Sequence, residues 1–247
     1  MNIAKLSLLA ALLCTPLVQA QTPSSAKSAT LEAPPSADLI YSVKIKHGWL
    51  TVNGQGFSKW ELHSNGYSLT NTARAGLLGK TYERGSSSNG GLNEAGLSPK
   101  QYTETPLNRE TTITTFNADK KLSFSVGAPS IDFPSGAQDR ASVAWQLATV
   151  ARSHPEKFVV GSEWNTFVAG RRDADIWRFK VVAKETINTK LGEIATIHFI
   201  KAPPAESQEQ QVDLWLAPSM EWYPVQIRLK EADGDFVEQT VERIVRK

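Results

Sequence analysis

The chain has 247 residues, of which 40% are hydrophobic, 21% charged and 9% aromatic, and its formal net charge is +2. This composition excludes collagen-like, disulfide-rich and wholly disordered classes of protein. A nearly neutral balance also argues against a protein built mainly to bind nucleic acid, since such proteins present a concentrated basic face. After the N-terminal segment, no apolar run approaches the roughly 18 residues that a membrane-spanning helix needs.

The first 20 residues have the pattern of a secretory signal peptide. Lys5 supplies a positive start, an apolar stretch follows, and residues 18–20 (VQA) fit a cleavage site after Ala20. Cleavage removes Cys14, the one cysteine of the chain, so the mature protein would depend on its core rather than on disulfides. Leu13 stands where a lipoprotein signal needs Gly, Ala or Ser, so lipidation of Cys14 is not expected. The sequence therefore predicts a periplasmic or secreted protein.

Residues 21–37 are rich in Pro, Ser and Ala and show no periodic pattern of apolar residues. Such a composition predicts a flexible tether that follows the signal peptide. Residues 38–247 contain no stretch that resembles a linker between domains, and no repeat of fixed period. We therefore expect a single β-rich domain there, long enough to bury about 70% of its unfolded-chain surface.

Short segments with strand character dominate this domain. Alternation of apolar and polar residues over 39–45 predicts a half-buried strand. Three pairs of such segments flank turn sequences and predict hairpins; they are residues 57–62 with 67–69, residues 111–116 with 122–126, and residues 225–230 with 236–244. Three further strands are expected at residues 176–182, 194–200 and 212–216. The order of elements favours an antiparallel meander over parallel strands joined by helices.

One segment has helical periodicity instead. Small and apolar residues recur at helical spacing over 139–152, Asp139 is a candidate N-cap, and Pro155 ends the pattern. A single helix among many strands predicts a large curved antiparallel sheet, or half-barrel, that curls around the helix or packs on it. Residues 85–96 (GSSSNGGLNEAG) predict a mobile loop, because the context of a phosphate-binding loop is missing.

The sequence contains no recognisable catalytic or metal-binding motif. None of the four histidines lies three to five residues from another histidine or a cysteine, so the spacing of a structural zinc site is missing. The nucleophile elbow of α/β-hydrolases is missing as well, and a triad assembled from distant strands cannot be recognised in a sequence. We therefore predict a protein without enzymatic activity, cofactor or metal, with a hydrolase as the more distant alternative.

Seven tryptophans are many for this length. Core packing is the first explanation, because tryptophan suits the packed faces of β-sheets. The functional alternative is a row of rings that lines a groove for acyl chains or sugars. On this hypothesis the candidate ligand-binding residues are Trp49, Trp60, Trp145 and Trp177. Arg171 and Arg172 could meet an anionic headgroup, although a solvated turn is the simpler explanation.

Several segments together resemble the bacterial domain-of-unknown-function family 3108. They are residues 39–43, the Gly48-Trp49-Leu50 segment with Gly54 and Gly56, residues 139–143 and 191–196, and above all residues 212–218 (VDLWLAP) and 222–227 (WYPVQI). The resemblance covers nearly all of residues 38–247 and implies an exported envelope protein with a large curved antiparallel sheet. It implies no reaction. The fold expected of the family is similar to open-barrel lipoprotein carriers of the periplasm, so ligand binding follows only by analogy of fold.

Three functions therefore remain open. The first is a non-enzymatic periplasmic protein that binds a lipid, an acyl chain or a lipoprotein for envelope maintenance, through burial of apolar surface. The second is a carbohydrate- or peptidoglycan-binding module with exposed Trp platforms. The third is a structural partner in an envelope complex, which pairs an exposed sheet edge with another protein.

Overall fold

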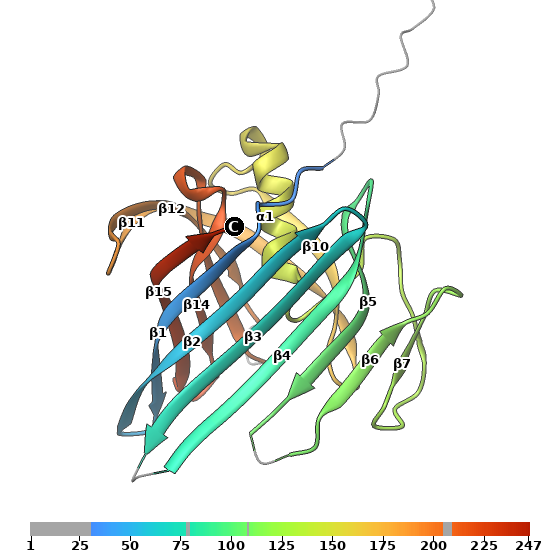
Figure 1. The fold of residues 1–247 in the computed structure, drawn as a ribbon, viewed down its shortest axis with the longest axis horizontal. Coiled ribbons are helices and arrows are strands. Elements are labelled where there is room, and N and C mark those ends of the chain that lie inside the picture. Colours follow the sequence, from blue (N-terminus) through green and yellow to red (C-terminus); the bar gives the residue numbers. More distant parts are fainter. Residues whose placement is uncertain (1–30, 78–79, 108, 205–208) are drawn as a thin grey trace, which may run out of the picture.

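The computed structural model describes residues 31–77, 80–107, 109–204 and 209–247. The predicted signal peptide and Cys14 lie outside these ranges. The described chain forms one 15-stranded sheet that curls around helix α1 (Val143–Ser153), as Figure 1 shows. The prediction of a mainly β protein with a large curved antiparallel sheet and one main helix is therefore confirmed.

The strands follow one another through short connections. In chain order they are β1 (Ala37–His47), β2 (Leu50–His63), β3 (Gly66–Leu77), β4 (Lys80–Asn93), β5 (Gly96–Thr105), β6 (Thr112–Phe116), β7 (Lys121–Phe124), β8 (Ile131–Asp132), β9 (Gln138–Asp139), β10 (Glu163–Ala169), β11 (Ala174–Thr189), β12 (Gly192–Lys201), β13 (Gln211–Ala217), β14 (Tyr223–Lys230) and β15 (Phe236–Arg246). Two short 3-10 helices, Pro155–Lys157 and Pro218–Met220, complete the described elements. No helix in these ranges has the length and apolar character to cross a membrane.

The sheet curls almost into a barrel but does not close. Its strand order is β8-β7-β6-β5-β4-β3-β2-β1-β15-β14-β13-β12-β11-β10-β9, so the short strands β8 and β9 are the two edges. The hydroxyl of Thr114 on β6 donates a hydrogen bond of 2.8 Å to the carbonyl of Gly170 in the β10–β11 turn. This bond joins the two ends of the sheet on the side where they approach each other, and the sheet therefore encloses an interior.

The strand β1 illustrates why these sequences form this sheet. Leu39, Tyr41 and Val43 are buried, and the residues between them are more exposed. Alternating side chains of a strand point to opposite faces, so this pattern directs the apolar face of β1 into the interior. The sequence predicts this strand correctly because the alternation is local.

Helix α1 begins at Val143, four residues later than Asp139, the start expected from the sequence. Asp139 belongs to β9, and its carboxylate accepts hydrogen bonds of 2.9 and 2.8 Å from the backbone N–H groups of Ala141 and Ser142. The carboxylate thus organises the turn that leads into the helix. The helical spacing begins before the helix itself because this turn also directs residues toward the core.

The Gly- and Ser-rich segment is a strand, and the prediction of a mobile loop over 85–96 is wrong. Residues 85–93 form the second half of β4, paired with β3 on one side and β5 on the other. A Cβ atom on Gly90 would overlap the carbonyl oxygen of Ser98. The Ser88 side chain is buried and donates a hydrogen bond of 2.6 Å to Asp139. Small residues are needed here because neighbouring strands and the start of α1 approach closely.

The end of the expected tether is packed against the domain. The indole N–H of Trp60 donates a hydrogen bond of 2.8 Å to the carbonyl of Pro34, and the Tyr223 hydroxyl donates one of 2.9 Å to that of Pro35. Ala33 and Ala37 are buried. Residues 31–37 therefore belong to the folded domain rather than to a flexible tether, because aromatic side chains of the core bind their backbone.

A candidate ligand-binding cavity

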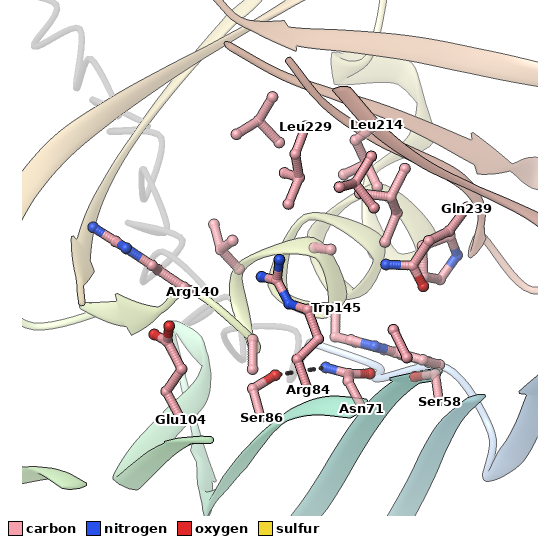
Figure 2. A pocket seen from close by; sticks show the side chains of 18 of the residues that line it. Ser58, Asn71, Arg84, Ser86, Glu104, Arg140, Trp145, Leu214, Leu229 and Gln239 are labelled. Atoms are coloured by element: carbon pink, nitrogen blue, oxygen red, sulfur yellow. Dashed lines mark hydrogen bonds between the residues drawn. The ribbon is translucent and has the colours of Figure 1, made fainter. Parts of the chain in front are cut away.

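A cavity of about 210 Å³ lies inside the curled sheet, next to the first turn of α1 (Figure 2). Side chains from β1 to β5, β11 and β13 to β15 line it. This volume is below the roughly 300–1,000 Å³ of pockets that enclose drug-sized molecules. The cavity therefore favours a narrow ligand, such as a single chain.

The cavity has two chemically different walls. The aliphatic wall, on β13 to β15, consists of Val212, Leu214, Ile227, Leu229 and Val237. The polar wall, on β2 to β5, consists of Ser58, Asn71, Arg84, Ser86 and Glu104. Figure 2 shows Leu214 and Leu229 on the opposite side of the cavity from Ser58, Asn71, Ser86 and Glu104. The arrangement suits a ligand that is apolar along one side or at one end.

Cross-strand register explains how the polar wall is assembled. Ser58 pairs with Asn71, Asn71 with Ser86, and Ser86 with Glu104. Directly paired residues point to the same face, so these four side chains form one row across four strands. The Asn71 amide donates a long hydrogen bond of 3.5 Å to the Ser86 hydroxyl. The Ser58 hydroxyl is buried and has no hydrogen-bond partner among the described residues.

The next row of the polar wall contains little side-chain volume. Gly56 pairs with Ala73, and Ala73 pairs with Arg84. A Cβ atom on Gly56 would lie 2.8 Å from Oε1 of Gln239, a residue of β15 that also lines the cavity. Glycine and alanine therefore leave open the space into which Arg84 and Gln239 extend.

Three charged residues line the cavity, and they differ in their partners. Arg140 lies 3.3 Å from the carboxylate of Asp173, and Glu104 accepts a hydrogen bond of 2.7 Å from the Tyr102 hydroxyl. Arg84 has no ion pair or hydrogen bond from its side chain within the described ranges. Arg84 is therefore the lining cation whose charge is not paired with a carboxylate in the described ranges.

A buried carboxylate holds the start of α1 beside the cavity. Asp139 is fully buried, and burial raises its pKa to about 6 although hydrogen bonds from Ser88 and Ser142 act in the opposite direction. The Ser88 hydroxyl also lies 2.8 Å from that of Tyr67. This network connects β3, β4 and the start of the helix, so it positions the cavity wall rather than facing a ligand.

The four predicted tryptophans do not form one row. Trp145 and Trp177 line the cavity. Trp60 is fully buried and stacks on Trp145, with 4.5 Å between ring centroids, so it belongs to the core. Trp49 is 95% exposed in the β1–β2 turn and does not line the cavity. The structure thus brings together two of the predicted residues at the cavity, while a third supports it from behind.

Sequence reasoning did not identify the charged residues of the cavity. Arg171 and Arg172 lie in the β10–β11 turn and do not line it, whereas Arg84 and Arg140 do. Arg84 and Ser86 occupy alternate positions of β4, which is the signal that could have revealed them. That signal was hidden because the glycines and serines of this strand suggested a loop.

A second polar cluster lies on the other face of the sheet. The His198 ring has its Nε2 atom 2.9 Å from Asp213 and its Nδ1 atom 3.0 Å from Glu185, and it stacks on Trp215. Burial of Asp213 opposes ionisation, but hydrogen bonds from His198 and other groups lower the pKa of this carboxyl overall. Leu214 faces the cavity, so its neighbours on β13 point away from it. In the part of the chain that the structure describes, no group of His, Cys, Asp and Glu could hold a metal ion.

Known structures include similar folds. A β-barrel-like protein of domain of unknown function DUF1849 from Brucella abortus has a TM-score of 0.57 and 11% identity, over 87% of this chain and 99% of that chain. A presumed exported protein with a YmcC-like fold from Bacteroides fragilis has a TM-score of 0.38 and 11% identity, over 88% of this chain and 100% of that chain. At these identities the first likeness concerns the fold alone, and the second is too weak to support an argument.

The chain matches no curated protein. The sequence pattern of the family described as "Protein of unknown function (DUF3108)" matches residues 40–241, which include every residue that lines the cavity. The resemblance noted in the sequence is thereby confirmed, and the chain belongs to the DUF3108 family.

Proposed function

We propose that this protein is an exported, non-enzymatic binding protein that holds an acyl chain of a lipid or lipoprotein in its interior cavity, for maintenance of the cell envelope. The observation that supports this function best is the aliphatic wall. Ile227, Leu229 and Val237 point into a cavity and are only partly buried, although they lie on the inner face of the sheet. Export is supported by the signal-like pattern of residues 1–20.

Burial of an acyl chain against this wall supplies enough free energy for reversible binding. Each buried methylene contributes about 0.8 kcal/mol, so a chain with about eight buried methylenes would contribute roughly 6 kcal/mol. The loss of translational and conformational freedom offsets part of this gain. We therefore expect affinities suited to a carrier that must also release its ligand.

The chemistry of the lining supports binding rather than catalysis. Among the described lining residues there is no histidine or cysteine, and neither the Ser58 nor the Ser86 hydroxyl has a hydrogen bond to a carboxylate. A nucleophilic serine needs a base within hydrogen-bond distance. We therefore place the hydrolase alternative behind the binding function.

The other two alternatives have less support. A glycan platform needs exposed rings, and of the four candidate tryptophans only Trp49 is exposed, while the ring of Trp177 is covered by the Lys201 ammonium at 5.5 Å. An edge that pairs with a partner needs length, and β8 and β9 have two residues each.

Native mass spectrometry of the protein purified from the periplasm, followed by solvent extraction and lipid analysis, tests this proposal. We expect a bound acyl-chain ligand at near-stoichiometric amounts, and the intact mass also reports whether cleavage occurs after Ala20. The variant Ala73→Trp should fill the cavity and abolish binding, whereas Gln55→Trp, on the outer face of β2, should not. Ligand-free protein that also ignores added fatty acids and phospholipids would contradict the proposal, as would undiminished binding by a folded Ala73→Trp variant.

A further inference from the structure

Arg84 is a guanidinium in an amphipathic cavity with no negative partner in the described structure. Figure 2 shows its side chain extending from β4 toward the side that Leu214 and Leu229 occupy. The neighbouring Arg74 points to the outer face and pairs with Glu83, as exposed arginines commonly do. Arg84 is also exposed, but its side chain lies on the cavity side of β4 and has no counter-charge within the described ranges.

The surroundings of Arg84 keep its guanidinium accessible. Its row-mates Ala73 and Gly56 are too small to pack over it. The carboxylate of Glu104 lies in the adjacent row, where it binds the Tyr102 hydroxyl, and Arg140 adds a second positive charge to the lining. Asp173 pairs with Arg140, so an anionic group placed here would meet Arg84 as the lining cation without a carboxylate partner in the described ranges.

Further hydrogen-bond donors lie in the row next to Arg84. The Ser58 hydroxyl is 5% exposed, lines the cavity and has no partner within the described ranges. A buried hydroxyl without a hydrogen bond is costly, so it is best explained by a partner that arrives with a ligand. The Asn71 amide and the Ser86 hydroxyl lie in the same row. A carboxylate or phosphate has several lone pairs and could accept hydrogen bonds from such a group of donors.

From these observations we infer that the ligand is a single-chain amphiphile with an anionic head, a carboxylate or a phosphate monoester, which Arg84 binds while the chain lies along the aliphatic wall. This inference rests on the proposed function and specifies its ligand class. Arg84 selects the head, and the aliphatic wall supplies the affinity that all chains of equal length share. A carboxylate and a phosphate monoester both present anionic oxygens, which a guanidinium recognises.

Isothermal titration calorimetry with three ligands of equal chain length tests the inference. The ligands are decanoate, decyl phosphate and decan-1-ol, each used below its aggregation concentration at low, matched ionic strength. Wild-type protein should bind the better of the two anions at least about tenfold more tightly than the alcohol, because a hydrogen bond to a charged group is worth that much or more. The ratio of decanoate to decyl phosphate affinity identifies the preferred head.

Variants separate the head site from the chain site. Arg84→Gln should lower the affinity for the preferred anion at least about tenfold and change the affinity for decan-1-ol much less, while Arg84→Lys should retain part of the preference for anions. Arg74→Gln is the matched control, since it removes one positive charge from the adjacent strand on the outer face and should leave all affinities as in wild type. Thermal unfolding should be unchanged in Arg84→Gln, because this side chain has no partner in the described structure to lose.

The outcomes distinguish the two proposals. Equal wild-type affinities for the anions and the alcohol would overturn the anionic head and leave the acyl-chain function standing. A preference for anions that survives in Arg84→Gln would overturn the assignment to Arg84. Failure of all three ligands to bind would contradict both the inference and the proposed function.

Discussion

The interior of the curled sheet has a filled part and a hollow part, and the same strands build both. On β2, the inward residue Trp60 is fully buried in the filled part, whereas Gly56 lies beside the cavity. On β3, the buried Leu69 is followed by Asn71 and then Ala73 along the same face. Strand pairing therefore sets the shape of the enclosure, while the size of the inward side chain in each row decides where the enclosure stays hollow.

The filled part should depend most strongly on its stacked aromatic rings. Trp60→Ala removes a fully buried ring that stacks on Trp145 and Tyr67, and we expect a loss of about 3–5 kcal/mol in the free energy of unfolding. Urea titration followed by circular dichroism measures it. Trp49→Ala, at a 95% exposed position, is the control and should change stability by less than about 0.5 kcal/mol. A similar small change for both variants would show that the stacked rings are not the core.

Strand β4, whose Gly- and Ser-rich composition predicted a loop, provides the next test. Gly90→Ala places a methyl group against the carbonyl of Ser98 and should destabilise the protein by about 1–3 kcal/mol. At the adjacent Gly91 no atom lies within 4 Å of an added Cβ, so Gly91→Ala should be neutral or slightly stabilising. Denaturant unfolding of the pair measures the difference. Equal stabilities would argue that this segment is not packed as a strand.

Asp139, at the boundary of the two parts, should make stability depend on pH. Burial raises its pKa from 3.8 to about 6, so the folded state binds the proton more tightly than the unfolded state. The stabilising effect of protonation is complete below pH 3.8 and is lost as pH rises through about 6. Relative to Asp139→Asn, wild type should therefore lose on the order of 1 kcal/mol between pH 5 and pH 7. Parallel urea titrations of both proteins would reveal this, and a constant difference across that range would contradict it.

Trp177 should separate binding from folding. It lines the cavity and is only partly buried, so Trp177→Ala should weaken decan-1-ol binding several-fold, by about 1 kcal/mol, with a smaller change in stability. Calorimetry and denaturant unfolding on the same preparation give both quantities. Equal losses in the free energies of binding and of unfolding would assign Trp177, like Trp60, to the core.

Patterns that depend on neighbours in the chain were readable before the structure. The alternation around Tyr41 predicted β1, turn sequences predicted three hairpins, and the spacing after Asp139 predicted α1 within a few residues. Two ordered segments were wrongly predicted to be flexible, for one reason. Residues 31–37 and β4 contain few apolar side chains, and they are ordered by groups distant in sequence, such as Trp60, Tyr223 and the paired strands.

The sequence by itself therefore determined the class of fold, the family and most of the strands, because periodicity and turn chemistry act over a few residues. Only the tertiary structure decided which inward rows are filled, which tryptophans are core, and that Arg84 faces an aliphatic wall. These properties depend on side chains from distant strands, which meet only when the sheet curls. The residue pattern within one strand holds no information about which side chains lie opposite it across the interior.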